Sequence, residues 1–163
     1  MRYDKIKMND ERKKINKISN KLNNGVVKIM IKVGDIFTHE LSYKQADVNT
    51  FAQITGDNNP IHLDAEFAAK TPFGRPIVHG FYSASVFSMV FGTKFPGEGT
   101  IYMYQDMKFL APVFVDEPYK AKFEVMEVNT DKHTGVIKCT LEDGNGKPVI
   151  EGTAKLKNNA QFV

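Results

Sequence analysis

The chain has 163 residues, 42% hydrophobic and 25% charged, a composition that suits one globular domain with its own core. A single cysteine excludes an internal disulfide and a cysteine-based zinc site, and no apolar run approaches the roughly 20 residues of a membrane span. The net charge of +3 is uneven: residues 1–29 hold nine basic and three acidic side chains, and the remainder holds 13 and 16. Without the apolar segment of a secretory signal, the chain is predicted to be cytoplasmic.

Residues 1–29 form a basic arm rich in Lys and Asn. Its few large apolar side chains include Ile15, Ile18 and Leu22 at helical spacing, so we expect the arm to be disordered or marginally helical. Two further segments are predicted, a folded domain over residues 30–157 and a short tail over residues 158–163.

The folded domain opens with a predicted strand over residues 33–41. The pattern Ser42-x-x-Gln45 resembles a capping box and predicts the start of a helix that ends at Gly56. The apolar side of this helix is expected to comprise Ala46, Phe51, Ala52 and Ile54. Residues 57–60 predict a turn, because the residue before a proline is pushed out of helical conformation. Asp64 is expected to cap a short helix that follows.

The second half of the chain predicts one helix and then strands. Residues 81–91 are apolar nearly all round, with only small hydroxyls between the large side chains, so we expect this helix to be buried. Alternating apolar residues predict strands over 101–109 and 119–128, with a bulge near 125–126 where the apolar phase flips. A hairpin is predicted from Ile137 to Leu156, turning at residues 143–146, with Cys139 as a small buried hydrophobe.

The strongest chemical signal is the turn Gly56-Asp57-x-Asn59-Pro60-x-His62. Taken alone, Asp57 indicates an Asx turn and His62 a partly buried histidine bonded to backbone. A rigid turn that carries both can also aim a carboxylate and an imidazole at one water molecule. Such a pair can add water to an activated double bond or remove it.

This stretch resembles the signature of the R-specific enoyl-CoA hydratases, the MaoC-like branch of the hot-dog superfamily. The matching positions are Phe51, Ile54, Thr55, Gly56, Asp57, Asn59, Pro60, Ile61, His62 and Ala68. The resemblance implies an α+β hot-dog fold, with a long buried central helix wrapped by an antiparallel sheet of about five strands. It implies reversible hydration of trans-2-enoyl-CoA to (R)-3-hydroxyacyl-CoA by Asp57 and His62. One would take a proton from water and the other would deliver one to Cα, with the assignment open.

The resemblance also assigns expectations to residues outside the dyad. A backbone N–H near Gly80, at the positive end of the helix dipole, would bind the thioester oxygen, whereas His79 is treated as structural. Asn59 and Ser88 are expected to support the dyad. Three further residues are candidate substrate contacts: Arg75, Phe81 and Tyr82. For Arg75, a coenzyme A phosphate contact and an ion pair are equal alternatives, and the two aromatics are core residues first.

No cofactor is expected, because the thioester supplies the activation, and the four histidines lack the spacing of metal ligands. The expected partners are an acyl-CoA and a second copy of the chain, in a homodimer or dimer-based oligomer, without a membrane or a nucleic acid. Two alternatives remain. One is a 3-hydroxyacyl-ACP dehydratase, which would use the same dyad on an acyl carrier protein. The other is a non-catalytic acyl-CoA-sensing regulator whose basic arm contacts DNA; an intact dyad argues against it.

Overall fold

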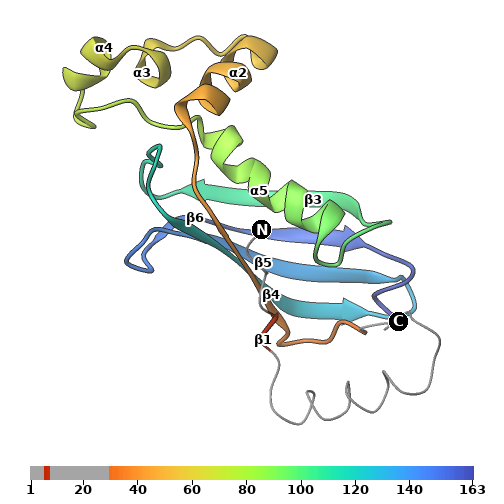
Figure 1. The fold of residues 1–163 in the computed structure, drawn as a ribbon. Coiled ribbons are helices and arrows are strands. Elements are labelled where there is room, and N and C mark those ends of the chain that lie inside the picture. Colours follow the sequence, from red (N-terminus) through yellow and green to blue (C-terminus); the bar gives the residue numbers. More distant parts are fainter. Residues whose placement is uncertain (1–5, 8–29) are drawn as a thin grey trace.

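The computed structural model describes residues 6–7 and 30–163. Six strands form one antiparallel sheet in the order β1-β2-β4-β5-β6-β3. The strands are β1 Ile6–Lys7, β2 Ile36–Leu41, β3 Ile101–Phe109, β4 Tyr119–Asn129, β5 Thr134–Glu142 and β6 Pro148–Lys157. The helices are α2 Gln45–Thr55, α3 Pro60–Leu63, α4 Ala65–Ala69 and α5 Gly80–Thr93. The longest helix, α5, lies along one face of the sheet, while α2, α3 and α4 gather beyond its N-terminal end (Figure 1).

The core lies between α5 and the central strands β4, β5 and β6. Alternate side chains of these strands are fully buried, as the period of two in the sequence predicts. They are Ala121, Phe123, Ile137, Cys139, Leu141, Ile150, Ala154 and Leu156. The predicted bulge is confirmed, because the register of β4 against β5 shifts between Val125 and Glu127. This long helix against an antiparallel sheet is the predicted hot-dog arrangement.

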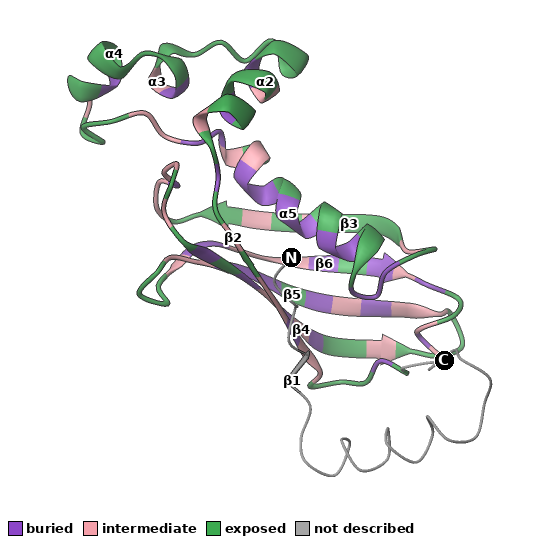
Figure 2. Cartoon of the chain, in the orientation of Figure 1, coloured by how far each residue is buried: buried purple, intermediate pink, exposed green. Residues whose placement is uncertain are grey.

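Helix α5 is not buried all round, which corrects the expectation from its composition. The side facing the sheet buries Phe87, Val90 and Phe91, whereas Phe81 is 72% exposed and Met89 is 37% exposed on the other side. Figure 2 shows this split along the helix. The error has a physical cause: periodicity reports which residues are apolar, but it does not report whether one chain supplies enough surface to cover both sides.

The capping-box expectation for α2 is wrong, although the end of the helix is confirmed. The N-cap is Lys44, whose side chain makes no cap bond, and the helix begins at Gln45. The Gln45 amide instead donates 3.0 Å bonds to the Asn49 side chain and to the His62 carbonyl oxygen. At the other end Gly56 has a φ of 79°, the left-handed conformation that glycine adopts without strain. The expected apolar side also fails at Ile54, which is 79% exposed.

The ends of the chain differ in what the structure describes. Strand β1 pairs with β2 at one edge of the sheet, and the rest of the predicted basic arm lies outside the described residues. After β6 the tail packs onto the domain: Phe162 is fully buried, and its carbonyl oxygen accepts a bond from His133. Within the described ranges, no helix is both long and apolar enough to cross a bilayer.

Candidate active site

The two residues of the predicted dyad lie on a short segment between α2 and α4. Asp57 directly follows Gly56 at the end of α2, and its side chain is exposed. The Asn59 side chain accepts a bond from the backbone N–H of Ile61, which makes Asn59 the N-cap of α3, with Pro60 in the first position of that helix. Two residues after Pro60, His62 lies on α3 and is buried. The turn and the N-cap of α3 therefore reverse the direction of the chain between Asp57 and His62.

A backbone contact orients the imidazole of His62. Its Nδ1–H donates a 2.8 Å hydrogen bond to the carbonyl oxygen of Ile77. In the neutral ring this leaves Nε2 as a bare acceptor. Burial lowers the pKa of His62 below the usual histidine value of 6.5. The Ile77 bond opposes that shift, the neighbouring His79 adds to it, and the Asp57 carboxylate opposes it. At neutral pH the ring is therefore uncharged and able to take up a proton.

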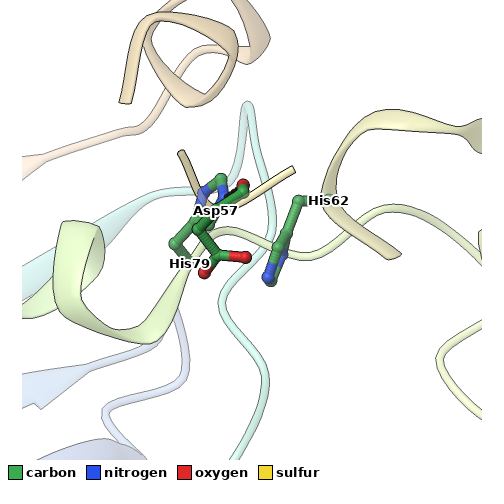
Figure 3. A group of neighbouring side chains, drawn as sticks. All are labelled: Asp57, His62 and His79. Carbon is green, nitrogen blue, oxygen red and sulfur yellow. Dashed lines mark hydrogen bonds between the residues drawn. The ribbon is translucent and has the colours of Figure 1, made fainter. Parts of the chain in front are cut away.

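A third side chain, His79, joins the dyad. One potential ligand atom from each of Asp57, His62 and His79 lies within 4.8 Å of the others (Figure 3). The two imidazole rings are 3.8 Å apart at their centroids, with an interplanar angle of 31°. Sequence spacing could not reveal this contact, because His79 belongs to the approach to α5 rather than to the turn.

Three such groups also raise the question of a metal ion. A metal lies close to the plane of each imidazole that binds it. Two rings 3.8 Å apart at their centroids, with only 31° between their planes, cannot both direct a lone pair at one ion in that way. The arrangement therefore suits a hydrogen-bonded acid–base site better than a metal centre, and the absence of a metal stays a prediction.

Gly80 is the first residue of α5, and the backbone N–H at this position of a helix has no intrahelical partner. The phenyl ring of Phe109 packs against it so closely that a Cβ on Gly80 would lie 3.0 Å from Phe109 Cε1. A side chain at this position would require the ring of Phe109, which is 48% exposed, to move by a few tenths of an ångström. The N–H of Gly80 lies one residue beyond His79. The site therefore places a bare imidazole nitrogen, a carboxylate and the start of a long helix close together.

Comparison with known proteins identifies the family. A family model of the MaoC-like domain matches residues 28–145. The chain belongs to the MaoC-like family. A 3-hydroxybutyryl-CoA dehydratase of Methylorubrum extorquens is 42% identical over 76% of this chain and 76% of its own length. An (R)-specific enoyl-CoA hydratase of Aeromonas caviae is 38% identical over 78% of this chain and 95% of its own length.

The solved (R)-hydratase of A. caviae superposes on this MaoC-like chain with a TM-score of 0.75, over 78% of this chain and 96% of that one. A mitochondrial 3-hydroxyacyl-[acyl-carrier-protein] dehydratase of Arabidopsis thaliana is 28% identical over 78% of this chain and 77% of its own length. These relatives are hydratases and dehydratases, and this MaoC-like protein is accordingly an enzyme of the hydro-lyase class.

The remaining predicted site residues are not gathered at the dyad of this MaoC-like chain. Ser88 lies on the exposed side of α5, eight residues beyond Gly80, or about 12 Å along the axis at the usual helical rise. Arg75 forms a 2.9 Å ion pair with Glu117 and lies over the ring of Phe114, so the ion-pair alternative describes its contacts.

The two candidate aromatics have different surroundings. Phe81 is 72% exposed and meets Phe109 edge-on. Tyr82 stacks on Phe51, with ring centroids 5.4 Å apart, and Phe51 in turn contacts His79. Tyr82 therefore belongs to the packing behind the site, as the core alternative expected, whereas Phe81 is open to a ligand or to another chain.

Proposed function

We propose that this chain is an R-specific enoyl-CoA hydratase, which adds water reversibly to trans-2-enoyl-CoA and gives (R)-3-hydroxyacyl-CoA. The observation that carries the proposal is the separation between a carboxylate oxygen of Asp57 and a ring nitrogen of His62, at most 4.8 Å. One water that forms hydrogen bonds of roughly 2.8 Å to both groups spans such a gap. The relatives named as R-specific hydratases support the same reaction and stereochemistry.

The tautomer of His62 supports a definite role for each member of the dyad. Because Nδ1–H is bonded to the Ile77 carbonyl oxygen, the bare Nε2 is the nitrogen available to accept a proton from water. The Asp57 carboxylate accepts the second hydrogen of that water, orients it, and stabilises the imidazolium that forms. Neither group brings a proton of its own to the reaction, so the proton that reaches Cα comes from the water.

The proposed steps conserve every proton and electron pair. His62 Nε2 takes one proton as the hydroxyl forms a bond to Cβ, and the electron pair of the double bond shifts onto the thioester oxygen as an enolate. The imidazolium then returns its proton to Cα on the same face, which regenerates neutral His62 and the thioester. Dehydration of the 3-hydroxyacyl thioester follows the same path in reverse. No cofactor takes part.

The enolate oxygen requires a hydrogen-bond donor, and we assign this role to the backbone N–H of Gly80. Two features support the assignment. Gly80 is the first residue of a helix of 14 residues, and its N-cap His79 provides no side-chain cap bond. The positive end of a helix dipole also favours developing negative charge.

A homodimer is part of the proposal, since one chain leaves a broad apolar surface open. On β3, the outer strand of the sheet, and on the adjoining side of α5, large apolar residues are between 37% and 72% exposed. They are Phe81, Met89, Ile101, Tyr102, Met103, Tyr104 and Phe109. A second copy that covers this surface would also enclose Phe81 and Ser88 and form the wall of an acyl pocket.

A second candidate is 3-hydroxyacyl-ACP dehydration, which the plant relative supports. The chemistry at the dyad would be identical, and the two candidates differ only in the group that carries the thioester. The regulator alternative has no comparable support, because ligand sensing does not require an acid–base pair such as Asp57 and His62.

The test is a spectrophotometric hydration assay with enoyl-CoA and enoyl-ACP substrates from C4 to C12, followed by chiral analysis of the products. Crotonyl-CoA is the first substrate, given the relative named as a 3-hydroxybutyryl-CoA dehydratase. Formation of (R)-3-hydroxyacyl-CoA with a kcat/KM above that for the ACP thioester supports the proposal. A preference for the ACP thioester selects the second candidate, and an S product or no turnover on either carrier overturns both.

A further inference from the structure

His79 is a buried side chain with an unusual hydrogen-bonding state. It is 2% exposed, and its Nε2–H donates a 3.0 Å bond to the backbone carbonyl oxygen of Asp57. Its other nitrogen, Nδ1, is buried and has no hydrogen-bond partner among the residues that the structure describes. Buried polar atoms are nearly always paired, so this unpaired nitrogen calls for an explanation.

Two backbone carbonyls fix the two stacked histidines in opposite tautomers. The Ile77 carbonyl oxygen accepts from His62 Nδ1–H, and the Asp57 carbonyl oxygen accepts from His79 Nε2–H. His62 therefore presents a bare Nε2, whereas His79 has its Nε2–H bonded to the backbone and its bare Nδ1 shielded from solvent. His79 is thus suited to holding Asp57 in place and unsuited to carrying the proton itself.

The two bonds that Asp57 makes within its own turn are long. The Asp57 N–H donates to Thr55 Oγ1 at 3.3 Å, and the Asp57 carboxylate accepts from the Asn59 N–H at 3.4 Å. Both bonds are within the turn. The 3.0 Å bond from His79 is shorter and comes from a residue 22 positions away, so it ties the turn to the start of α5.

The ring of His79 constrains the other half of the dyad. It lies against the ring of His62 at 3.8 Å between centroids, and the ring of Phe51 contacts it at 5.0 Å. One side chain therefore contacts both members of the dyad, Asp57 through its backbone and His62 through its ring.

We propose that His79 is a positioning residue that sets the distance between Asp57 and His62 through its Nε2–H bond to the Asp57 carbonyl oxygen. It touches neither the water nor the substrate in this role. The inference rests on the proposed hydratase function, since the readout is turnover by that dyad. A small displacement of one catalytic group lowers the rate of the chemical step while leaving substrate binding nearly intact.

Two substitutions separate the hydrogen bond from the packing of the ring. His79→Phe keeps an aromatic ring and removes the donor, whereas His79→Gln removes the ring and keeps an amide N–H at the position of Nε2. We expect His79→Phe to lower kcat by about 10- to 100-fold with little change in KM. We expect His79→Gln to retain most of the wild-type kcat. The reverse order, or equal kcat values for the two variants, overturns the proposal.

A matched control is available at the far end of the sheet. The ring Nδ1–H of His133 donates a 3.0 Å bond to the Phe162 carbonyl oxygen, the same kind of bond at the same length. His133→Gly, chosen because glycine has no side-chain donor and tolerates the φ of 52° at this position, should leave kcat unchanged. A loss of kcat equal to that of His79→Phe would show a general effect of removing such a bond, and would overturn the assignment.

NMR of the histidine ring nitrogens in the wild-type chain tests the same inference without a substitution. It therefore remains a test even if the His79→Phe variant fails to fold. The expected spectrum shows His79 as the Nε2–H tautomer and His62 as the Nδ1–H tautomer; an Nδ1–H tautomer at His79 overturns the proposal. Parallel assays of Asp57→Asn and His62→Gln identify a failure of the proposed function instead. Full activity in those variants refutes the dyad, whereas their inactivity beside an active His79→Phe refutes only the role of His79.

Discussion

The central sheet and the segment from α2 to α4 are held together in different ways. Strands β4, β5 and β6 bury a continuous set of apolar side chains, eight of them completely. The helical segment over residues 45–69 buries only Val48, Ala52, His62 and Ala68 among its side chains, and most of its surface is open (Figure 2). Its shape depends instead on caps and on bonds between polar side chains and backbone, such as Gln45 to the His62 carbonyl oxygen.

This difference separates the region that provides stability from the region that provides the catalytic groups. Burial of apolar area is the main favourable term in folding, so the sheet carries most of the stability. The dyad lies in the region that contributes little burial, where polar groups can be oriented with small cost to the fold. Changes in the segment should therefore lower turnover more than stability, and changes in the sheet should do the opposite.

The largest expected effect is on the dyad. Asp57→Asn and His62→Gln should each lower kcat by about 10²- to 10⁴-fold, the usual contribution of one positioned acid or base. KM should change little, since neither residue is expected to bind the coenzyme A portion. Steady-state kinetics measure the loss of turnover, and thermal unfolding measures any loss of stability in the same variants. A folded variant with near-normal turnover would remove that residue from the mechanism.

The next effect concerns the donor at Gly80, which Gly80→Pro and Gly80→Ala separate. Both add a Cβ near Phe109, but only proline removes the N–H. Proline is tolerated at the first position of a helix, and the ψ of 135° at His79 suits a residue before proline. The proline variant should have a kcat about 10²- to 10³-fold below that of the alanine variant. Equal kcat values would place the oxyanion donor elsewhere.

A smaller effect is expected from pH. Because the pKa of His62 lies below 6.5, kcat/KM should be constant near neutral pH and fall on the acid side, by about tenfold per pH unit below that pKa. A base that also returns the proton predicts no alkaline limb from the dyad, whereas a separate acid and base predict a bell-shaped profile.

The same lowered pKa affects stability. The unfolded chain takes up a proton at this histidine before the folded chain does, so stability should fall as pH drops from 6.5 through the folded pKa. Denaturant unfolding at several pH values measures this change in stability. A stability that rises as the pH drops from 6.5 would contradict the burial of His62.

The smallest effects come from a matched pair in the two regions. Ile137→Val removes one methylene from a fully buried position of β5 and should cost about 0.5–1.5 kcal/mol of unfolding free energy, with kcat unchanged. Ile54→Val makes the same change on α2, where the side chain is 79% exposed, and should change stability by less than about 0.5 kcal/mol. Denaturant unfolding measures both values. Similar values at the two positions would remove the distinction between the regions.

The same contrast explains how much the sequence could predict. The alternation of β4 to β6, the bulge at Met126 and the Asp64 cap are local patterns, and the structure has all three. The turn that carries Asp57 and His62 is equally local, and its two side chains are brought together as expected. These features depend on neighbours within a few residues, which a pattern can report.

The features that could not be predicted depend on contacts between distant residues. The amide of Gln45 bonds to the His62 carbonyl oxygen, and no local rule indicates that it is unavailable for a capping box. His79 reaches Asp57 across 22 positions. The exposure of Phe81 depends on surface that one chain does not supply. The role of Ser88 followed from the family resemblance, and the roles of Ser88 and Arg75 stay predictions.

Cys139, the single cysteine of the chain, offers a way to measure how often the sheet opens. Cys139 is fully buried in β5, and burial raises its pKa to about 12, so the folded chain presents almost no thiolate to an alkylating reagent. The rate of labelling in native buffer therefore measures how often β5 separates from its neighbours. Because the dyad lies on another segment, comparing that rate with the loss of turnover would show whether the enzyme loses activity before it unfolds.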